Sequence, residues 1–272
     1  MPFSVFRGPL SVAVSPLCVG FLLASVLGAH AVPPLVTDDA EVADHEVFEI
    51  YTGFDYQGGG GSVSRELPTT ELDYGILDRT EFSLVIPYLS QSGQAGFGDL
   101  DPGVKYIVIE ETKTWPAIAA SFDCKLTNGS VGRGLGSGNF NYDFLVPVQK
   151  SWGWFTAMAD IGFNLVGNTH FQGVTERRYN LWFAGFAERY KINEKTTLLS
   201  EVYAQRADAP GQPNLCAFDV GFEREIGHGV ALQGAIGRSL RESNHDGPTL
   251  QIYVGLHWTF DAPWKREKKD EK

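Results

Sequence analysis

From residue 46 onward the chain alternates apolar and polar residues with a period of two, which predicts strands with two different faces. No segment has a convincing 3.6-residue amphipathic period. The predicted strands are 46–56, 66–74, 79–88, 100–109, 116–126, 139–149, 154–166, 179–190, 196–205, 215–225, 230–239 and 250–260. Most are ten or eleven residues long, whereas ordinary globular strands have about 5 to 6 residues and tilted membrane-spanning strands about 9 to 11. Strand length therefore favours a transmembrane barrel.

The connections between the predicted strands alternate in length along the chain. The odd-numbered connections have 9 to 12 residues, and those between them have 4 to 6. Outer-membrane barrels have short periplasmic turns at one rim and longer extracellular loops at the other. The pattern therefore predicts an all-β fold, a transmembrane up-and-down antiparallel β-barrel of about 12 strands over residues 46–260, with both termini on the periplasmic side.

The two faces of the predicted strands differ in polarity. In the last strand one face is apolar from Leu250 to Phe260, and the other carries Gln251 and His257. Many ionisable groups on the inner face cannot form a dry core, because an unpaired buried charge is very costly. We therefore expect the apolar face to contact lipid and the polar face to line a lumen. The candidate lumen and transport residues are Glu49, Asp55, Glu71, Asp73, Glu81, Lys105, Asp123, Lys125, Asp143, Asp160, Glu201, Asp219, Glu223 and His257.

One strand does not follow this alternation. In 179–190, Leu181 and Phe183 compete with Trp182 and Phe186 for the outer face. Aromatic residues support the barrel elsewhere, because interfacial belts favour amphipathic rings. Tryptophans gather at the predicted periplasmic rim, at positions 115, 152, 154, 258 and 264.

The first 31 residues have the features of a secretory signal peptide. Arg7 precedes an uncharged stretch from Gly8 to Ala29, and Ala29–Ala31 forms an A-x-A-like cleavage site. An uncleaved anchor is the alternative, but two prolines and the small-residue end argue against it. Cleavage predicts export to the outer membrane of a Gram-negative bacterium.

Two further segments flank the predicted barrel. Residues 32–45 form an acidic, periplasmic N-terminal segment that either folds into the pore or hangs free, and residues 261–272 form a charged periplasmic tail. The whole chain has a net charge of -11, so binding to a phosphate backbone is not expected. Cys124 and Cys216 have outward parity on distant strands, so we expect no disulfide.

Several motifs match those of a known family. They are PLVTDDA at 34–40, YGILDR at 74–79, EFSLVIPY at 81–88, GFGD at 96–99 through GVKY at 103–106, PAIA at 116–119 into KLTNG at 125–129, and GSG at 136–138 through DIGFNLVG at 160–167. With these motifs the chain resembles the putative outer-membrane transporter family called the meta-pathway of phenol degradation family. The resemblance implies a barrel with a transport function, no catalytic motif, and aromatic or hydrophobic substrates. KLTNG lacks the proline expected in its middle, and the chain continues past Phe260.

The sequence gives little support for a nucleotide-binding or metal-binding site. The glycine-rich stretch 132–138 has the spacing of neither a dinucleotide fingerprint nor a P-loop, so we expect an external loop. Two acidic clusters could bind a hard cation through carboxylate oxygens, but neither provides a complete ligand set. Their members are Asp38, Asp39, Glu41, Asp44 and His45, and Asp99 and Asp101. We expect solvated acidic faces, no metal site and no cofactor.

The chain is not expected to be an enzyme. It has no G-x-S-x-G motif, its six histidines are dispersed, and none has convincing zinc-ligand spacing. An outer-membrane hydrolase stays open as an alternative, because a catalytic set assembled from distant strands leaves no sequence motif.

The leading hypothesis is an outer-membrane channel or facilitated transporter for small solutes with an acidic lumen that enriches cations. Its expected contacts are outer-membrane lipid and a small-molecule solute, with no nucleic acid, and the oligomeric state is open. Twelve strands lie between barrels that fill their own interior and wide porins, so we expect a narrow or partly plugged pore. Another alternative is a closed barrel with a structural or loop-binding role, sealed by Lys105 and Lys125 paired with carboxylates.

Overall fold

The computed structural model describes residues 33–59, 62–91, 94–171, 174–176, 178–207, 214–240 and 249–265. The predicted signal peptide and residues 266–272 of the predicted tail lie outside these ranges. The strands are β1 Val47–Gly59, β2 Ser62–Leu77, β3 Thr80–Gln91, β4 Gln94–Phe97, β5 Asp101–Ile109, β6 Ala117–Lys125, β7 Asn141–Trp152, β8 Phe155–Val166, β9 Thr169–Phe171, β10 Val174–Glu176, β11 Leu181–Asn193, β12 Thr196–Gln205, β13 Leu215–Gly227, β14 Val230–Ser239 and β15 Leu250–Asp261.

Twelve of these strands form a closed antiparallel barrel, as predicted. Neighbours along the chain pair in an up-and-down order, β1 pairs with β15, and the pairing of β2 with β3 completes the ring. Closure leaves no barrel strand with an unpaired edge. No helix among the described residues is long and apolar enough to span a membrane.

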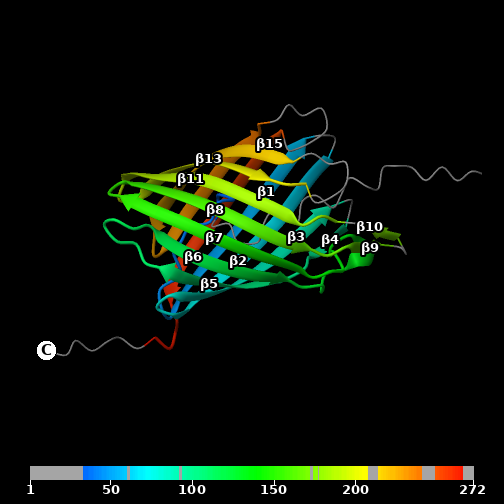
Figure 1. The fold of residues 1–272 in the computed structure, drawn as a ribbon, viewed down its shortest axis with the longest axis horizontal. Coiled ribbons are helices and arrows are strands. Elements are labelled where there is room, and N and C mark those ends of the chain that lie inside the picture. Colours follow the sequence, from blue (N-terminus) through cyan, green and yellow to red (C-terminus); the bar gives the residue numbers. More distant parts are fainter. Residues whose placement is uncertain are drawn as a thin grey trace, which may run out of the picture.

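The two ends of the barrel differ as the connection lengths predicted. The short turns and the described C-terminal residues lie at one end, and β4, β9 and β10 lie at the other (Figure 1). We call these ends the short-turn rim and the long-loop rim. The long connections were predicted as loops, but β4 extends the sheet next to β3, and β9 pairs with β10 in a separate hairpin. The glycine-rich connection also contains a 3-10 turn, η3 Val131–Arg133.

The barrel is apolar outside and polar inside. Large hydrophobic side chains such as Phe144, Val220 and Leu256 are exposed on the outer face, while Asp123 and Gln233 are buried on the inner face. This is the reverse of a soluble barrel, and it matches a barrel whose outer face contacts lipid.

The strand with ambiguous parity follows the same rule. In β11, Trp182 is 55% exposed on the outer face and Leu181 is only 2% exposed on the inner face. Phe183 and Phe186 take opposite faces accordingly, since successive side chains alternate across a strand. Leu181 and Phe183 are therefore apolar residues of the interior.

The described residues after β15 stay at the short-turn rim. The Trp264 ring packs edge-on against Phe48 with centroids 5.9 Å apart, and its Nε1 donates to the Tyr74 hydroxyl over 3.3 Å. These aromatic contacts tie the start of the tail to β1 and β2. The rim thus has the amphipathic rings that the sequence placed there.

Candidate functional site

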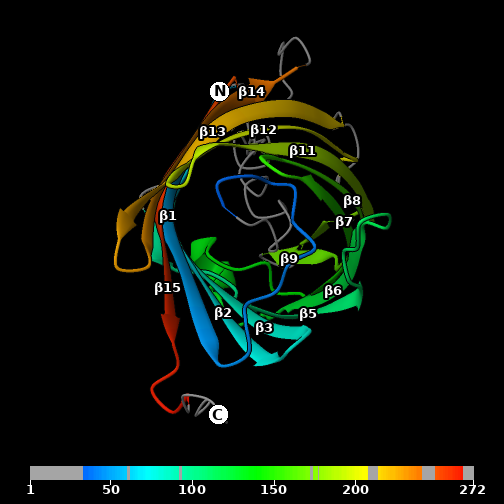
Figure 2. The same cartoon turned by 90° about the vertical axis from the view of Figure 1, so that its left-hand side faces the viewer.

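Residues 33–45, here called the inner segment, lie inside the barrel, as the blue trace in Figure 2 shows. The sequence had left open whether this segment enters the pore. At the short-turn rim Glu46 takes a positive φ of 58°, and the chain reverses from the inner segment into β1. Two backbone hydrogen bonds of 2.9 Å fix this reversal, from Glu46 N to Gly75 O and from Val47 N to Asp44 O.

Three carboxylates of the barrel wall accept hydrogen bonds from backbone N–H groups of the inner segment. Glu201 accepts from the N–H groups of Val36 at 2.7 Å and of Thr37 at 2.8 Å. Asp160 accepts from the Asp38 N–H at 2.6 Å, and Glu81 accepts from the Ala43 N–H at 2.6 Å. A segment outside regular structure needs such partners for its buried backbone groups.

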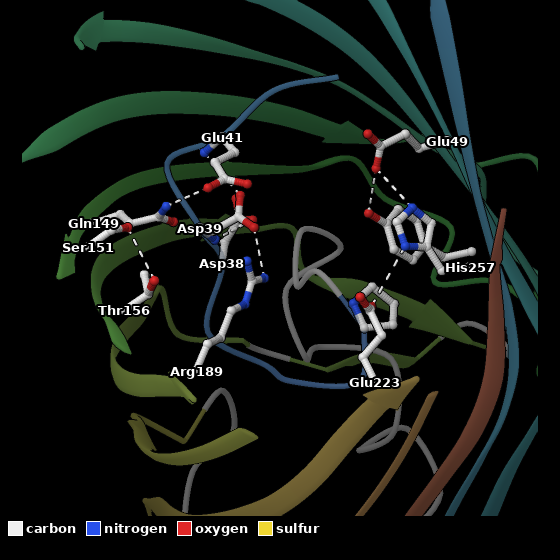
Figure 3. A network of polar contacts seen from close by, with 12 residues as sticks. Asp38, Asp39, Glu41, Glu49, Gln149, Ser151, Thr156, Arg189, Glu223 and His257 are labelled. Carbon is white, nitrogen blue, oxygen red and sulfur yellow. Dashed lines mark hydrogen bonds and ion pairs between the residues drawn. The ribbon is translucent and has the colours of Figure 1, made fainter. Parts of the chain in front are cut away.

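Two cations of the wall, Lys105 and Arg189, bind the side chains of the inner segment, and Figure 3 shows the contact of Arg189. Lys105 Nζ lies 3.0 Å from Asp38 Oδ1 and 3.8 Å from Asp39 Oδ1. Arg189 Nη2 lies 2.8 Å from Asp39 Oδ2. Gln149 adds a hydrogen bond from its Nε2 to Glu41 Oε1 at 2.6 Å. Charged hydrogen bonds of this kind are stronger than neutral ones.

A second polar network lies on the opposite wall, in β1, β13, β14 and β15. His257 Nε2 lies 3.0 Å from Glu49 Oε2, and its Nδ1 lies 3.7 Å from Glu223 Oε2 (Figure 3). The Tyr51 hydroxyl donates to Glu49 over 2.8 Å, and the Tyr51 ring stacks on the imidazole with centroids 4.1 Å apart. Gln233 joins this network to the inner segment.

Gln233 donates two hydrogen bonds from its side-chain nitrogen. Gln233 Nε2 lies 2.7 Å from the Pro33 carbonyl oxygen and 2.8 Å from Glu223 Oε2. The inner segment therefore has polar contacts on both sides of the barrel.

The candidate lumen residues include carboxylates that face each other directly across neighbouring strands. Their positions pair Glu49 with Asp73, Asp123 with Asp143, and Glu201 with Asp219. Like charges directly opposite each other destabilise a sheet. Three such pairs of facing carboxylates lie on the inner face of the barrel.

The remaining candidates lie on the same wall. Glu71 is buried on β2, Lys125 is buried at the long-loop end of β6, and Asp55 is half-buried on β1. The structure thus brings the predicted residues to the barrel interior, while their part in transport stays a prediction.

Burial and neighbouring charges shift the pKa values of the inner segment. Burial raises the pKa of the Asp38 carboxyl to about 7, although Lys105 acts in the opposite direction. Burial also works against ionisation of Asp39, but Arg189 and Lys105 outweigh it and hold its pKa below the usual value. The charge of Asp39, followed by burial, raises the pKa of Glu41. The two adjacent aspartates therefore differ in protonation near neutral pH.

Docking of the inner segment should strengthen as the pH falls through about 7. A solvated aspartate has a pKa near 3.9, so the docked segment, with Asp38 raised to about 7, binds a proton more tightly than the free one. The contribution of Asp38 is complete below its solvated pKa and disappears as the pH rises through about 7. The lowered pKa of Asp39 has the opposite effect on docking, but only at more acidic pH.

Carboxyl NMR of aspartate-labelled protein measures this directly, with Asp38→Asn identifying the resonance. We expect its titration midpoint near 7. A midpoint at the solvated value would show that Asp38 is not buried in the barrel.

Two features of this site were not predicted from the sequence. Asp38 and Asp39 were expected on a solvated face, which is wrong, because they are buried against Lys105 and Arg189. Arg189 was not a candidate because the alternation in its strand was ambiguous. Once Trp182 is placed outside, the period of two puts position 189 inside.

The described residues contain no group of three or more His, Cys, Asp or Glu side chains arranged to hold a metal ion. Cys124 and Cys216 are both free.

No family model matches the chain, and no curated protein matches it. Solved structures do match. The COG4313 outer membrane channel from Pseudomonas putida F1 has a TM-score of 0.65 and 14% identity, over 81% of this chain and 96% of that one. The NanC porin has a TM-score of 0.56 and 10% identity, over 78% and 98%. The KdgM porin has a TM-score of 0.56 and 11% identity, over 78% and 99%. At these identities the likeness shows the fold, which is that of porin-like outer-membrane barrels.

Proposed function

We propose that the protein is an outer-membrane channel or facilitated transporter for small solutes, with an inner wall that favours cations. The leader is removed on export, and the short-turn rim faces the periplasm. The closed barrel, its apolar outer face and its polar inner face support a membrane location. The resemblance to the phenol-degradation family adds aromatic or hydrophobic compounds as a substrate class.

The facing carboxylates of the wall carry the proposal of cation preference. The candidate lumen residues comprise 11 carboxylates (Glu49, Asp55, Glu71, Asp73, Glu81, Asp123, Asp143, Asp160, Glu201, Asp219 and Glu223) against two lysines and one histidine, and Arg189 adds one cation. Lys105 and Arg189 are already engaged by the inner segment. A narrow path lined by one sign of charge in low-dielectric walls concentrates ions of the opposite sign.

A liposome-swelling assay tests the proposed function on the mature chain. We expect a small organic cation to enter faster than a neutral solute of equal size, and an organic anion to enter most slowly. Liposomes with heat-unfolded protein are the control. Equal rates for the three solutes would contradict an acidic path. Absence of swelling from a folded barrel would instead support a closed barrel with a structural or loop-binding role.

A further inference from the structure

The contacts of the inner segment extend around most of the barrel. Its hydrogen bonds and ion pairs reach side chains of β3, β5, β7, β8, β11, β12 and β14. Glu81, Gln149, Arg189 and Gln233 lie in the halves of their strands nearer the short-turn rim, and Lys105, Asp160 and Glu201 lie near the middle of theirs. A segment with partners on so many strands crosses the lumen, and it does not simply line one wall.

The inner segment makes two kinds of contact with the wall, and these differ in specificity. The carboxylates Glu201, Asp160 and Glu81 accept backbone N–H groups, which almost any extended peptide offers. Lys105 and Arg189 bind two adjacent aspartates. The wall therefore recognises an extended peptide that carries two consecutive carboxylates.

Glycines in two strands make room for the inner segment. A Cβ at Gly75 of β2 would overlap the carbonyl oxygens of Ala43 and Asp44, and a Cβ at Gly185 of β11 would overlap the Thr37 hydroxyl. A glycine inside a strand weakens it and often marks the close approach of another backbone. The wall is therefore shaped for this segment by positions far from it in sequence.

The barrel does not depend on the inner segment for its own hydrogen bonds. The twelve strands pair around the whole ring without it. Within the described residues, only the isolated bridge between His45 and Gly75 links the segment to a strand in ladder fashion. The segment can thus leave the lumen beyond the turn at Glu46 without breaking a strand pairing.

We propose that the barrel wall between the short-turn rim and the middle of the strands is a binding site for an extended acidic peptide, occupied in this structure by the protein's own residues 33–44, and that this segment is a detachable plug controlling flux. The binding site stands on the contacts alone, while control of flux rests on the channel function proposed above. The occupant is part of the same chain, and an external peptide of the same chemistry would compete with it.

The experiment uses a variant of the mature chain that lacks residues 33–43, reconstituted in planar bilayers. We expect severalfold larger conductance steps than those of the full mature chain. A synthetic peptide with the sequence of residues 33–45, added on the short-turn side, should return the conductance to the full-chain level. The same peptide with Asp38→Asn and Asp39→Asn should block much more weakly. Unchanged conductance on deletion, or equal block by the two peptides, would overturn the proposal that the segment is a plug.

A binding assay separates the plug from the channel function. Fluorescence anisotropy of the labelled peptide with the shortened barrel in detergent reports docking without any flux. Binding without conductance would retain the peptide site and remove the channel function. Conductance without binding would retain the channel and remove the peptide site.

A point variant covers the case in which the shortened chain fails to fold. Gly185→Ala places a methyl group against Thr37 and should raise the conductance of the full chain. Gly162→Ala on the neighbouring strand is the matched control, because its Cβ would meet the movable end of Leu145, 2.8 Å away, and no atom of the segment is among the nearest. Equal conductance of two folded variants, checked by heat-modifiable gel mobility, would contradict the proposal.

Discussion

Replacing Lys105 by Met should release the inner segment from the barrel. The lysine side chain is 6% exposed and lies within ion-pair distance of Asp38, Asp39 and Glu81. Breaking a buried ion pair costs about 3 to 5 kcal/mol, because the partner is left buried and uncompensated. We expect the docking free energy to fall by about 3 kcal/mol, the low end of that range, because Asp38 can take up a proton.

Limited digestion with a glutamate-specific protease measures this release. In the folded protein in detergent, cleavage after Glu41 should be slow for the wild type and fast for Lys105→Met, with the fragments identified by mass. Lys150→Met is the matched control, because Lys150 pairs with Glu111 at 3.1 Å and donates to the Thr112 carbonyl oxygen, and neither partner belongs to the inner segment. Equal cleavage rates in Lys105→Met and the control would show that Lys105 does not hold the segment.

Placing an arginine at Val220 should destabilise the barrel in a lipid bilayer. Val220 lies near the middle of β13, is 47% exposed and points away from the interior. Arginine on the lipid face costs about 2 to 4 kcal/mol at the bilayer midplane and about 0 to 1 near the interfaces. We therefore expect the free energy of unfolding to fall by about 2 to 4 kcal/mol for Val220→Arg.

Urea titration of the barrel folded into liposomes measures the change. Ile226→Arg is the control at the end of the same strand, because Ile226 is 60% exposed next to the turn at His228. Its cost should stay below about 1 kcal/mol. Similar costs at the two positions would mean that the outer face of β13 does not span a membrane as described.

The barrel was predictable because local sequence patterns define its strands and connections. The period of two defines each strand, and the alternating connection lengths define the two rims. Strand β12 agrees with its predicted range, 196–205, at both ends. The ambiguous strand needed its neighbours, since Leu181 and Trp182 are both apolar and only pairing in the closed barrel decides which faces inward.

The sequence allowed the inner segment to enter the pore, but its contacts with the wall were not predictable in the same way. Thr37 and Gly185, or Asp38 and Lys105, are brought together by closure of the ring and share no local pattern. The acidic run looked like a solvated surface because its cationic partners lie on other strands. One indication was present in the sequence: Gly185 lies inside the predicted strand 179–190, and a glycine at such a position can mark the approach of another segment.

We propose above that this barrel is a membrane channel with an acidic inner wall. The most direct test is the reversal potential of single channels under a potassium chloride gradient, for the full mature chain and for the chain without residues 33–43. The account predicts discrete steps whose reversal potential has the sign of cation selectivity in both proteins. Steps with anion selectivity, or with no selectivity, would contradict it.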